Sequence, residues 1–323
     1  MPKHRCAVVI PTKNAIAILP RVMAKVLSQK TPWTYEIIVI DSGSSDGTAE
    51  YLRGLEQVRL IEIAPEEFGH GKTRNLGIEA ADADFAAFIT HDAEPTDEHW
   101  LQHLVLAAER DARIAGVFGR HLAYESASPF TKRDLSLHFD GFLNQPLIVY
   151  KDLDAQRYET DLGWRQFLHF YSDNNSLMRK SVWENFPYPD VEFAEDQLWA
   201  KEIIEAGYWK AYSPEATVFH SHDYTFIEQL KRAFDESRNF SKYFGYKLSA
   251  SPARACAAIL KSTVKALGES VEERYGPATF GNRLERAAQR IATITGHCLG
   301  ANHEKLPECI AQRLSLDYRL FKA

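Results

Sequence analysis

The chain has 323 residues, of which 45% are apolar and 25% are charged, a composition typical of globular proteins rather than disordered or fibrous ones. No apolar run approaches the roughly 20 residues that a membrane-spanning helix needs. The four or five apolar residues near the N-terminus predict a buried strand rather than a signal peptide. Four cysteines without metal-ligand spacing predict reduced thiols and a cytoplasmic protein: Cys6, Cys256, Cys298 and Cys309.

Charge is distributed unevenly along the sequence. The formal net charge is −6, but residues 226–323 hold 16 Lys and Arg against 10 Asp and Glu, whereas the rest of the chain holds 22 against 34. A basic segment attached to an acidic body indicates an anionic partner for that segment. A solvated helical face that is rich in lysine and arginine explains the same composition equally well.

Strands and helices alternate over the first 93 residues. Short β-branched or apolar runs predict four strands, at 6–10, 35–41, 58–63 and 84–93. Apolar residues at helical spacing predict helices at 18–29, after the turn "SGSSDG", and at 71–81. This alternation is typical of an α/β fold with a doubly wound, mostly parallel sheet.

The second part of the chain is less regular up to about residue 226. A strand end followed by a helix is predicted at 172–186, a helix at 194–207 that ends at Gly207, and a strand with a loop at 216–225. From residue 226 onward the pattern is helical. We therefore expect one domain over residues 1–225 and a C-terminal helical region over residues 226–323.

Polar side chains follow several of the predicted strands. Asn14, Asp41 and Asp92 all lie just beyond strand ends, and ligands of doubly wound sheets bind at the carboxyl ends of the strands. Asp92 alone would be explained equally well as a cap for a helix that starts near Pro95. The coincidence of three such positions favours a ligand site.

Three further motifs carry charged groups, and each also has a purely structural explanation. Lys72 and Arg74 stand at a predicted helix start in "FGHGKTRNLG", which suits an anion site or a charged surface turn. Glu195 and Asp196 begin a helix whose dipole favours their ionised forms, so they are candidates for a general base or a capping pair. His220 and His222 would share one face of a strand, as ligands for a metal or as an ordinary surface pair.

The order of the motifs is more specific than any one of them. "VVIPTKNA", "IIVIDSGSSDGT", "KTRNLGI", "FITHDA" and "AEDQLWAKEI" follow one another along the chain. This series resembles glycosyltransferase family 2, whose members are inverting enzymes with the GT-A fold. The resemblance covers roughly residues 6–225.

The resemblance implies roles for individual residues. Asp196 would be the catalytic base, with Glu195 beside it. The nucleotide and the donor sugar would contact residues of the first, second and third motifs, namely Pro11, Thr12, Asn14, Asp41, Lys72, Arg74 and Asn75. Asn174, Asn175 and Trp183 would line the acceptor side, because amides and aromatic faces bind sugars, while Trp199 is better explained as a core residue.

"THDA" occupies the place of the family's DxD metal motif. Asp92 would hold a divalent cation, Mg²⁺ or Mn²⁺, with His222 and also His220 as candidate further ligands. Thr90 stands where the first aspartate of DxD is expected. The strict dependence on metal is therefore left open.

"EFGHGKTRN" together with "THDA" is most similar to the rhamnosyltransferase branch of the family. That similarity implies dTDP-L-rhamnose as the donor and a saccharide or lipid-linked saccharide as the acceptor, in the synthesis of bacterial surface polysaccharide. We expect a protein at the inner face of the cytoplasmic membrane that contacts anionic lipid or forms a homo-oligomer, and we expect no nucleic-acid partner.

Three alternatives remain open from the sequence. A family 2 transferase with another donor, such as a UDP-sugar, fits the same motifs. A sugar-1-phosphate nucleotidyltransferase shares the α/β sheet, although "VVIPTKNA" lacks the glycine-rich loop typical of those enzymes. A non-catalytic carbohydrate-binding relative would explain the missing first aspartate.

Overall fold

The computed structural model describes residues 2–249 and 251–316, and the chain forms two compact units. The first unit comprises Met1–Leu122, Ser136–Val191 and Glu195–His220. The second comprises Ala123–Leu135, Glu192–Ala194 and Ser221–Ala323. These units describe compactness rather than independent folding, so the domain boundary expected at residue 225 stays a prediction.

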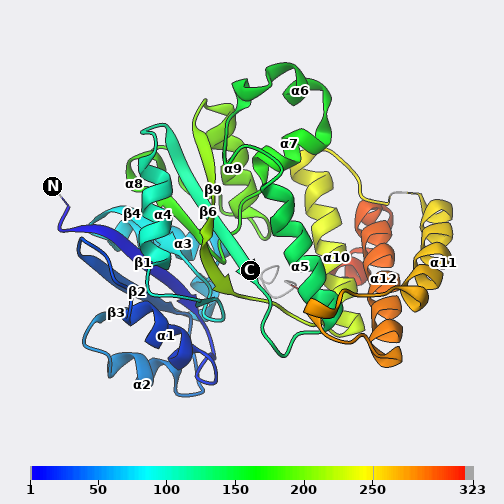
Figure 1. Ribbon diagram of the computed structural model, residues 1–323, viewed down its shortest axis with the longest axis horizontal. Coiled ribbons are helices and arrows are strands. Elements are labelled where there is room, and N and C mark those ends of the chain that lie inside the picture. Colours follow the sequence, from blue (N-terminus) through cyan, green and yellow to red (C-terminus); the bar gives the residue numbers. More distant parts are fainter. Residues whose placement is uncertain (1, 250, 317–323) are drawn as a thin grey trace. The chain divides into compact units, whose positions relative to one another are not determined.

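A mixed sheet of nine strands, counted over the described residues, forms the core of the first unit (Figure 1). Its order is β3-β2-β1-β4-β8-β6-β9-β5, and β7 also pairs with β9. The bounds are β1 His4–Thr12, β2 Tyr35–Asp41, β3 Val58–Glu62, β4 Ala83–Phe88, β5 Glu94–Pro95, β6 Ile114–Leu122, β7 Ile148–Val149, β8 Ser176–Arg179 and β9 Trp209–Phe219.

Strand direction follows the connections. β1 pairs in parallel with β2 and β4, β2 with β3, and β6 with β9, whereas β8 lies antiparallel between β4 and β6. Parallel neighbours need a crossover between them, and helices supply it in this half of the chain. The expectation of an α/β fold with a mostly parallel sheet is confirmed.

Alternate residues of β1 face opposite helical layers. Cys6, Val8 and Ile10 belong to the hydrophobic cluster that also holds the buried faces of α1 and α4. On the other face, Val9 meets α3, where a Cβ on Gly77 would come within 2.3 Å of a Val9 methyl group. Only glycine permits this close approach of helix to sheet. The result is a sheet that is covered on both faces, as parallel sheets are.

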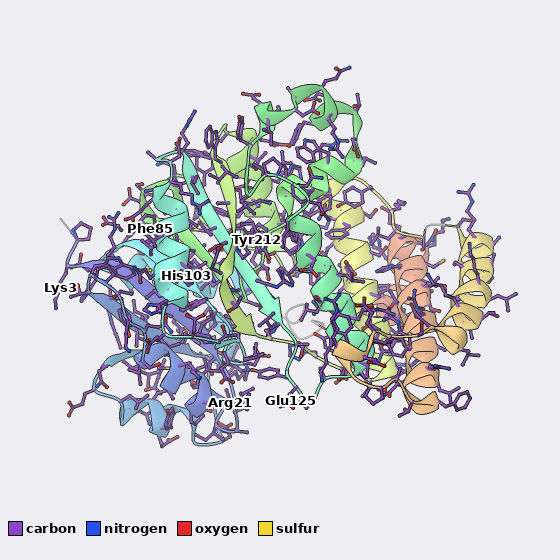
Figure 2. The ribbon with its side chains drawn as sticks, in the orientation of Figure 1. Lys3, Arg21, Phe85, His103, Glu125 and Tyr212 are labelled. Carbon is purple, nitrogen blue, oxygen red and sulfur yellow. The ribbon has the colours of Figure 1, made fainter. Side chains whose placement is uncertain are left out.

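The helices of the first unit flank this sheet and the aromatic cluster beside it. Phe118 of β6 stacks on Tyr212 of β9, with ring centroids 4.9 Å apart. Phe142 of α5 packs edge-on against Phe118, with ring centroids 5.0 Å apart. Figure 2 labels Tyr212, and also Phe85 of β4. The helices are α1 Leu19–Leu27, α2 Thr48–Arg53, α3 His70–Ala80, α4 Trp100–Glu109, α5 Pro129–Phe142, α6 Ala155–Thr160, α7 Leu162–His169, α8 Lys180–Trp183 and α9 Glu195–Glu205, with short helical turns η1 Pro65–Glu67 and η2 Lys151–Leu153.

The second unit is helical, as predicted from residue 226 onward. Its elements are α10 Phe226–Asn239, η3 Phe240–Phe244, α11 Pro252–Gly268, η4 Glu273–Tyr275, α12 Phe280–Ala301, η5 His303–Lys305 and α13 Glu308–Leu314, together with the first residues of α5. Gly296 and Gly300 allow α12 to approach α10, since a Cβ on either would lie 2.3 Å from a carbonyl oxygen of α10. Figure 1 shows α10, α12 and α11 as neighbouring yellow to orange-red helices.

Three strand bounds differ clearly from the prediction, and one of them is the start of β9, at Trp209 instead of residue 216. The fourth strand stops at Phe88 instead of residue 93, because the chain turns there and the Ala93 amide donates a hydrogen bond to the Thr90 carbonyl over 3.0 Å. β9 stops at Phe219, so His220 and His222 follow the strand rather than share one of its faces. In residues 2–249 and 251–316, no helix is both long and apolar enough to cross a membrane.

Candidate active site

The acid pair Glu195–Asp196 begins α9 as predicted, and Arg74 from α3 lies against it. Arg74 Nη1 donates a hydrogen bond to Glu195 Oε1 over 3.0 Å, and its Nε lies 3.2 Å from Asp173 Oδ2. Arg74 and Glu195 are 4% and 7% exposed, whereas Asp196 is partly exposed. The structure therefore brings Arg74 to the acid pair, with Asp196 as the more accessible of the two carboxylates.

Asp173 is a third carboxylate of this cluster, which sequence reasoning missed. It is 3% exposed, and it accepts hydrogen bonds from the Tyr188 hydroxyl and, over 3.2 Å, from Ser176 Oγ. Its backbone amide lies 3.4 Å from Asp196 Oδ2. The available signal was its place in "SDNNS", directly before the two asparagines that were predicted to face the acceptor.

Three carboxylates around one guanidinium change the protonation of the site. Burial raises the pKa of Asp196 well above its usual range, and the negative charges of Glu195 and Asp173 act in the same direction. Burial raises the pKa of Asp173 to about 6, although Arg74 opposes this shift. These effects oppose the helix dipole, which was expected to keep Asp196 ionised. A raised pKa makes Asp196 a stronger proton acceptor, closer to the range that general bases use.

Asn14 and Asp41 lie together at the carboxyl ends of β1 and β2. The Asn14 amide donates to Ser44 Oγ over 2.7 Å, its side-chain Oδ1 accepts from the Ser45 amide over 2.9 Å, and Asp41 Oδ1 accepts from the Ser44 amide over 2.9 Å. Asn14 has a positive φ of 48°, a conformation that asparagine tolerates better than most residues. Pro11 and Thr12 are buried at the end of β1, where Thr12 pairs with Asp41.

Lys72 and Asn75 stand on α3 in different surroundings. The Lys72 side chain is exposed. Asn75 Nδ2 donates to the Tyr188 carbonyl over 2.8 Å, and its Oδ1 accepts from Trp183 Nε1 over 2.8 Å. Two residues that were assigned to donor and acceptor, Asn75 and Trp183, therefore contact each other and fix the segment between α8 and Tyr188.

The two adjacent asparagines differ sharply in burial. Asn175 is fully buried; its Oδ1 accepts from Trp100 Nε1 over 2.8 Å, and its Nδ2 donates to the carbonyls of Ala216 and Arg120 over 2.8 and 3.1 Å. These contacts tie α4, β6 and β9 together, which is a structural role. Asn174 is partly exposed. Trp199 is fully buried, so its assignment to the core is confirmed.

Asp92 lies in the turn after β4, next to the end of β9. His220 Nε2 is 3.8 Å from Asp92 Oδ1, and both side chains are mostly buried. The helix that follows begins at Trp100, with His99 at its N-cap, so Asp92 does not cap it. An imidazole and a carboxylate are both common ligands of divalent transition metals. His222 belongs to the second unit.

His121 on β6 is a second residue of this site that the sequence did not reveal. Its ring lies edge-on to that of His220, with centroids 5.3 Å apart. Burial, followed by the charges of His220 and His138, holds the pKa of His121 well below its usual range. Within the described residues, no hydrogen-bond partner reaches its buried Nε2. His121 is therefore a neutral ring that packs behind His220.

The sequence profile of the family described as "Glycosyl transferase family 2" matches residues 7–186. The chain belongs to glycosyl transferase family 2. Membership makes the protein a glycosyltransferase that uses a sugar nucleotide, so the nucleotidyltransferase alternative is not retained. The matched segment holds every motif of the site up to Trp183, and it ends shortly before Glu195 and Asp196.

Two bacterial members of family 2 resemble this chain over most of their length. The chain is 36% identical to the O-antigen chain rhamnosyltransferase RfbN of Salmonella typhimurium, over 72% of this chain and 71% of that protein. It is 32% identical to the O-antigen chain rhamnosyltransferase WbaN of Salmonella anatum, over 70% and 69%.

Solved structures show the GT-A fold for this family 2 chain. The mannosyltransferase PcManGT of Pyrobaculum calidifontis, in complex with GDP-Man and Mn²⁺, superposes with a TM-score of 0.55 at 16% identity, covering 99% of this chain and 85% of that chain. TarS 1-349 of S. aureus in complex with UDP-GlcNAc gives a TM-score of 0.52 at 14% identity, covering 90% of both chains. At sequence identities this low, the similarity supports a shared fold but not a shared function.

Proposed function

We propose that the protein transfers L-rhamnose from dTDP-L-rhamnose to a hydroxyl group of a saccharide or lipid-linked saccharide, in the synthesis of bacterial O-antigen. The observation that carries this proposal is the 36% identity with an O-antigen chain rhamnosyltransferase over about 70% of both chains. The second such relative, at 32% identity, supports the same transferred sugar and the same class of product.

The nucleoside is proposed to bind at the ends of β1 and β2. Asn14 is exposed there, at the sheet edge where α/β proteins hold their ligands, whereas Asp41 is buried beneath it and accepts hydrogen bonds from Ser44. A carboxylate accepts hydrogen bonds from the N–H of a base or from ribose hydroxyls. Lys72, exposed on α3, is proposed to contact the diphosphate, together with the first turn of that helix.

In the proposed reaction, the acceptor hydroxyl attacks the anomeric carbon from the face opposite the leaving diphosphate. A new C–O bond forms, the bond from the anomeric carbon to the phosphate oxygen breaks, and dTDP leaves with that electron pair. Asp196 takes the hydroxyl proton, which its raised pKa favours. Glu195 and Asp173, both held by Arg74, position Asp196 and keep a negative environment around it.

A divalent cation is proposed beside Asp92. Asp92 Oδ1 and His220 Nε2, which lie 3.8 Å apart, would be its protein ligands. Imidazole favours a transition metal over Mg²⁺, so Mn²⁺ is the better fit. His222, two residues beyond His220, is proposed as a further ligand. When bound, the cation would neutralise charge on the diphosphate.

The acceptor is proposed to approach Asn174, with Trp183 further along the same segment. The C-terminal helices are proposed to bind anionic lipids on the inner face of the cytoplasmic membrane, where lipid-linked acceptors lie. Helix α11 supports this proposal because Leu260, Val264 and Leu267 form an exposed apolar stripe, 70%, 66% and 37% exposed, beside Lys261 and Lys265. An apolar stripe next to basic residues is typical of interfacial helices.

A thermal-shift comparison of dTDP, UDP and GDP, each with and without Mn²⁺, tests the donor. We expect dTDP to raise the unfolding midpoint most, since a ligand that binds only the folded state stabilises it by mass action. Transfer is then measured with dTDP-L-rhamnose and a saccharide acceptor. A larger midpoint shift with UDP would contradict the assignment of dTDP-L-rhamnose as the donor, but it would not contradict the transferase activity.

A further inference from the structure

The second unit contains a polar cavity to which the proposed reaction assigns no role, apart from His222 in its wall. Its volume is about 310 Å³, at the lower end of the range for small-molecule pockets. Its walls come from the first residues of α5, the loop after β9, α10 and α12. The side chains that matter here are Phe130, Tyr224, Gln229, Asn282, Glu285 and Gln289. All of the lining residues belong to this one unit.

The charges of the wall balance one another. Arg286 and Arg290 line the cavity, as do Asp223 and Glu285. Both guanidinium groups already have acidic partners, because Arg286 pairs with Asp134 and Arg290 Nη2 lies 3.5 Å from Glu269 Oε2. A cavity whose cations are compensated in this way attracts neither a phosphate nor another anion strongly. Its charge therefore favours a neutral ligand.

The remaining wall combines groups that suit a carbohydrate. The amides of Gln229 and Gln289 carry donors and acceptors, as sugar hydroxyl groups require, and Asn282 adds its Nδ2 donor, because its Oδ1 already accepts from the amide and hydroxyl of Thr279. The rings of Phe130 and Tyr224 also line the cavity, but other side chains already cover them: Arg286 lies 5.6 Å from the Phe130 centroid, and Arg232 and the His222 ring each lie 5.3 Å from the Tyr224 centroid. Few apolar side chains line the rest of the cavity, so a purely hydrophobic ligand would leave these amides unsatisfied.

Hydrogen bonds hold this wall in place before a ligand arrives. Gln229 Nε2 donates to Thr293 Oγ1 over 2.9 Å, and Gln289 Nε2 donates to the Tyr224 carbonyl. The Ser128 amide donates to Asp223 Oδ2 over 2.9 Å, which fixes the start of α5 against the loop after β9. Such preorganisation lowers the entropic cost of binding. By contrast, the carboxylate of Glu285 lies on an exposed residue at the rim.

We propose that this cavity binds a neutral saccharide, namely a sugar unit of the acceptor other than the one that receives rhamnose. The proposal rests on the proposed function, since it takes a glycan as the acceptor. It assigns the second unit a role in recognising the length or the composition of that glycan. Glu285 would accept hydrogen bonds from two sugar hydroxyl groups, and Asn282, one turn earlier on the same helix, would contact the same ring.

The test uses saturation-transfer NMR on the full chain with four probes. Three are neutral glycosides, methyl α-L-rhamnoside, methyl α-D-mannoside and methyl β-D-galactoside, and the fourth is glycerol 3-phosphate as an anion. We expect at least one neutral glycoside to bind and the anion not to bind. Glu285→Ala should weaken that glycoside by about tenfold, the usual size of a lost hydrogen bond to a charged group. Glu273→Ala, which removes an equally exposed glutamate elsewhere in the unit, should leave binding unchanged.

The outcomes separate this proposal from the donor assignment. If no neutral glycoside binds, if only glycerol 3-phosphate binds, or if Glu285→Ala binds as well as the unchanged protein, the saccharide site is wrong. The midpoint shift with dTDP is measured on the same samples, because it depends on the first unit and reports the proposed function separately. An unfolding midpoint of Glu285→Ala equal to that of Glu273→Ala shows that the loss of binding is not a loss of fold.

Discussion

Arg74 Nη1 lies 3.0 Å from Glu195 Oε1, although 121 positions separate the two residues in the chain. Arg74 also lies 3.2 Å from Asp173 through its Nε, so one buried guanidinium holds two buried carboxylates. An arginine suits this position because its planar fork donates to two partners at once. The contact fixes the first turn of α9, and with it the neighbouring Asp196. We therefore propose that Arg74 positions Asp196, the proposed general base.

Asp196→Asn is expected to lower kcat by about 10² to 10⁴-fold, the usual cost of losing a general base. The amide keeps the shape of the side chain but cannot take a proton, so the affinity for dTDP should stay within about twofold. Turnover and dTDP binding are measured together. Glu202→Gln, an exposed acid on the same helix, is the matched control. Turnover close to normal in Asp196→Asn would show that another group accepts the proton.

Arg74→Met is expected to be destabilising, by about 3 to 5 kcal/mol, because it leaves Glu195 and Asp173 buried without their cation. Arg74→Lys should recover part of this stability, since one ammonium cannot match both carboxylates as the guanidinium does. Chemical denaturation of the three proteins gives the free energies of unfolding. If Arg74→Met is as stable as the unchanged protein, the ion pairs are not stabilising.

The pH dependence of turnover should move in the same variants. The base form of Asp196 predominates only above its raised pKa, so activity is expected to rise with pH through an acid limb. Arg74 lowers the pKa of Asp196, Asp173 and Glu195. Replacing it with lysine weakens that contact and should shift the limb of kcat/KM to higher pH. If the acid limb of the kcat/KM profile stays at the same pH, or moves to lower pH, Arg74 does not control the protonation of Asp196.

Asp92→Asn tests the proposed cation site. The increase in dTDP affinity that Mn²⁺ produces is expected to fall about tenfold or more, while binding of thymidine without phosphate stays the same. Calorimetry with and without Mn²⁺, and after EDTA treatment, measures both. Asp152→Asn makes the same charge change at an exposed position of the first unit and should behave like the unchanged protein. Equal metal dependence in both variants would remove Asp92 from the site.

The apolar stripe of α11 gives a prediction about membranes. Leu260→Ser with Val264→Ser should reduce binding to vesicles that contain anionic lipid by about tenfold or more, because each change removes apolar area from the interface. Lys261→Gln with Lys265→Gln should remove up to about 1 kcal/mol per charge, and this effect should shrink at high salt. Leu106→Ser, at an exposed leucine of α4, is the control.

Vesicle sedimentation at low and high salt measures these differences. If the unchanged protein does not sediment with anionic vesicles at low salt, the stripe serves another purpose. Analytical ultracentrifugation of the same variants then tests whether the stripe forms a homo-oligomer. Such an oligomer should dissociate to a smaller species when Leu260 and Val264 are changed.

The first four strands could be predicted from the sequence, because each is a short apolar run between turn signals, whereas β6, Ile114–Leu122, was not predicted. The runs at β1, β2 and β3 agree with the structure to within two residues at most ends. The end of β4 was placed too late, since Ile89 is as apolar as the strand before it, and only the turn closed by Ala93 and Thr90 stops the pairing. β5 and β7 have two residues each, too few for any periodicity.

The sequence alone determined that candidate polar residues lie at the strand ends and at the start of α9, because those positions follow from local pattern and motif order. The tertiary structure alone decided which of them meet. Arg74 was expected to contact phosphate, and its burial beside Glu195 and Asp173 depends on packing between α3, α9 and the loop before β8. His121 and Asp173 carried no motif of their own. Protonation was likewise decided in three dimensions, since a carboxylate responds to burial and to charges that are distant in the chain.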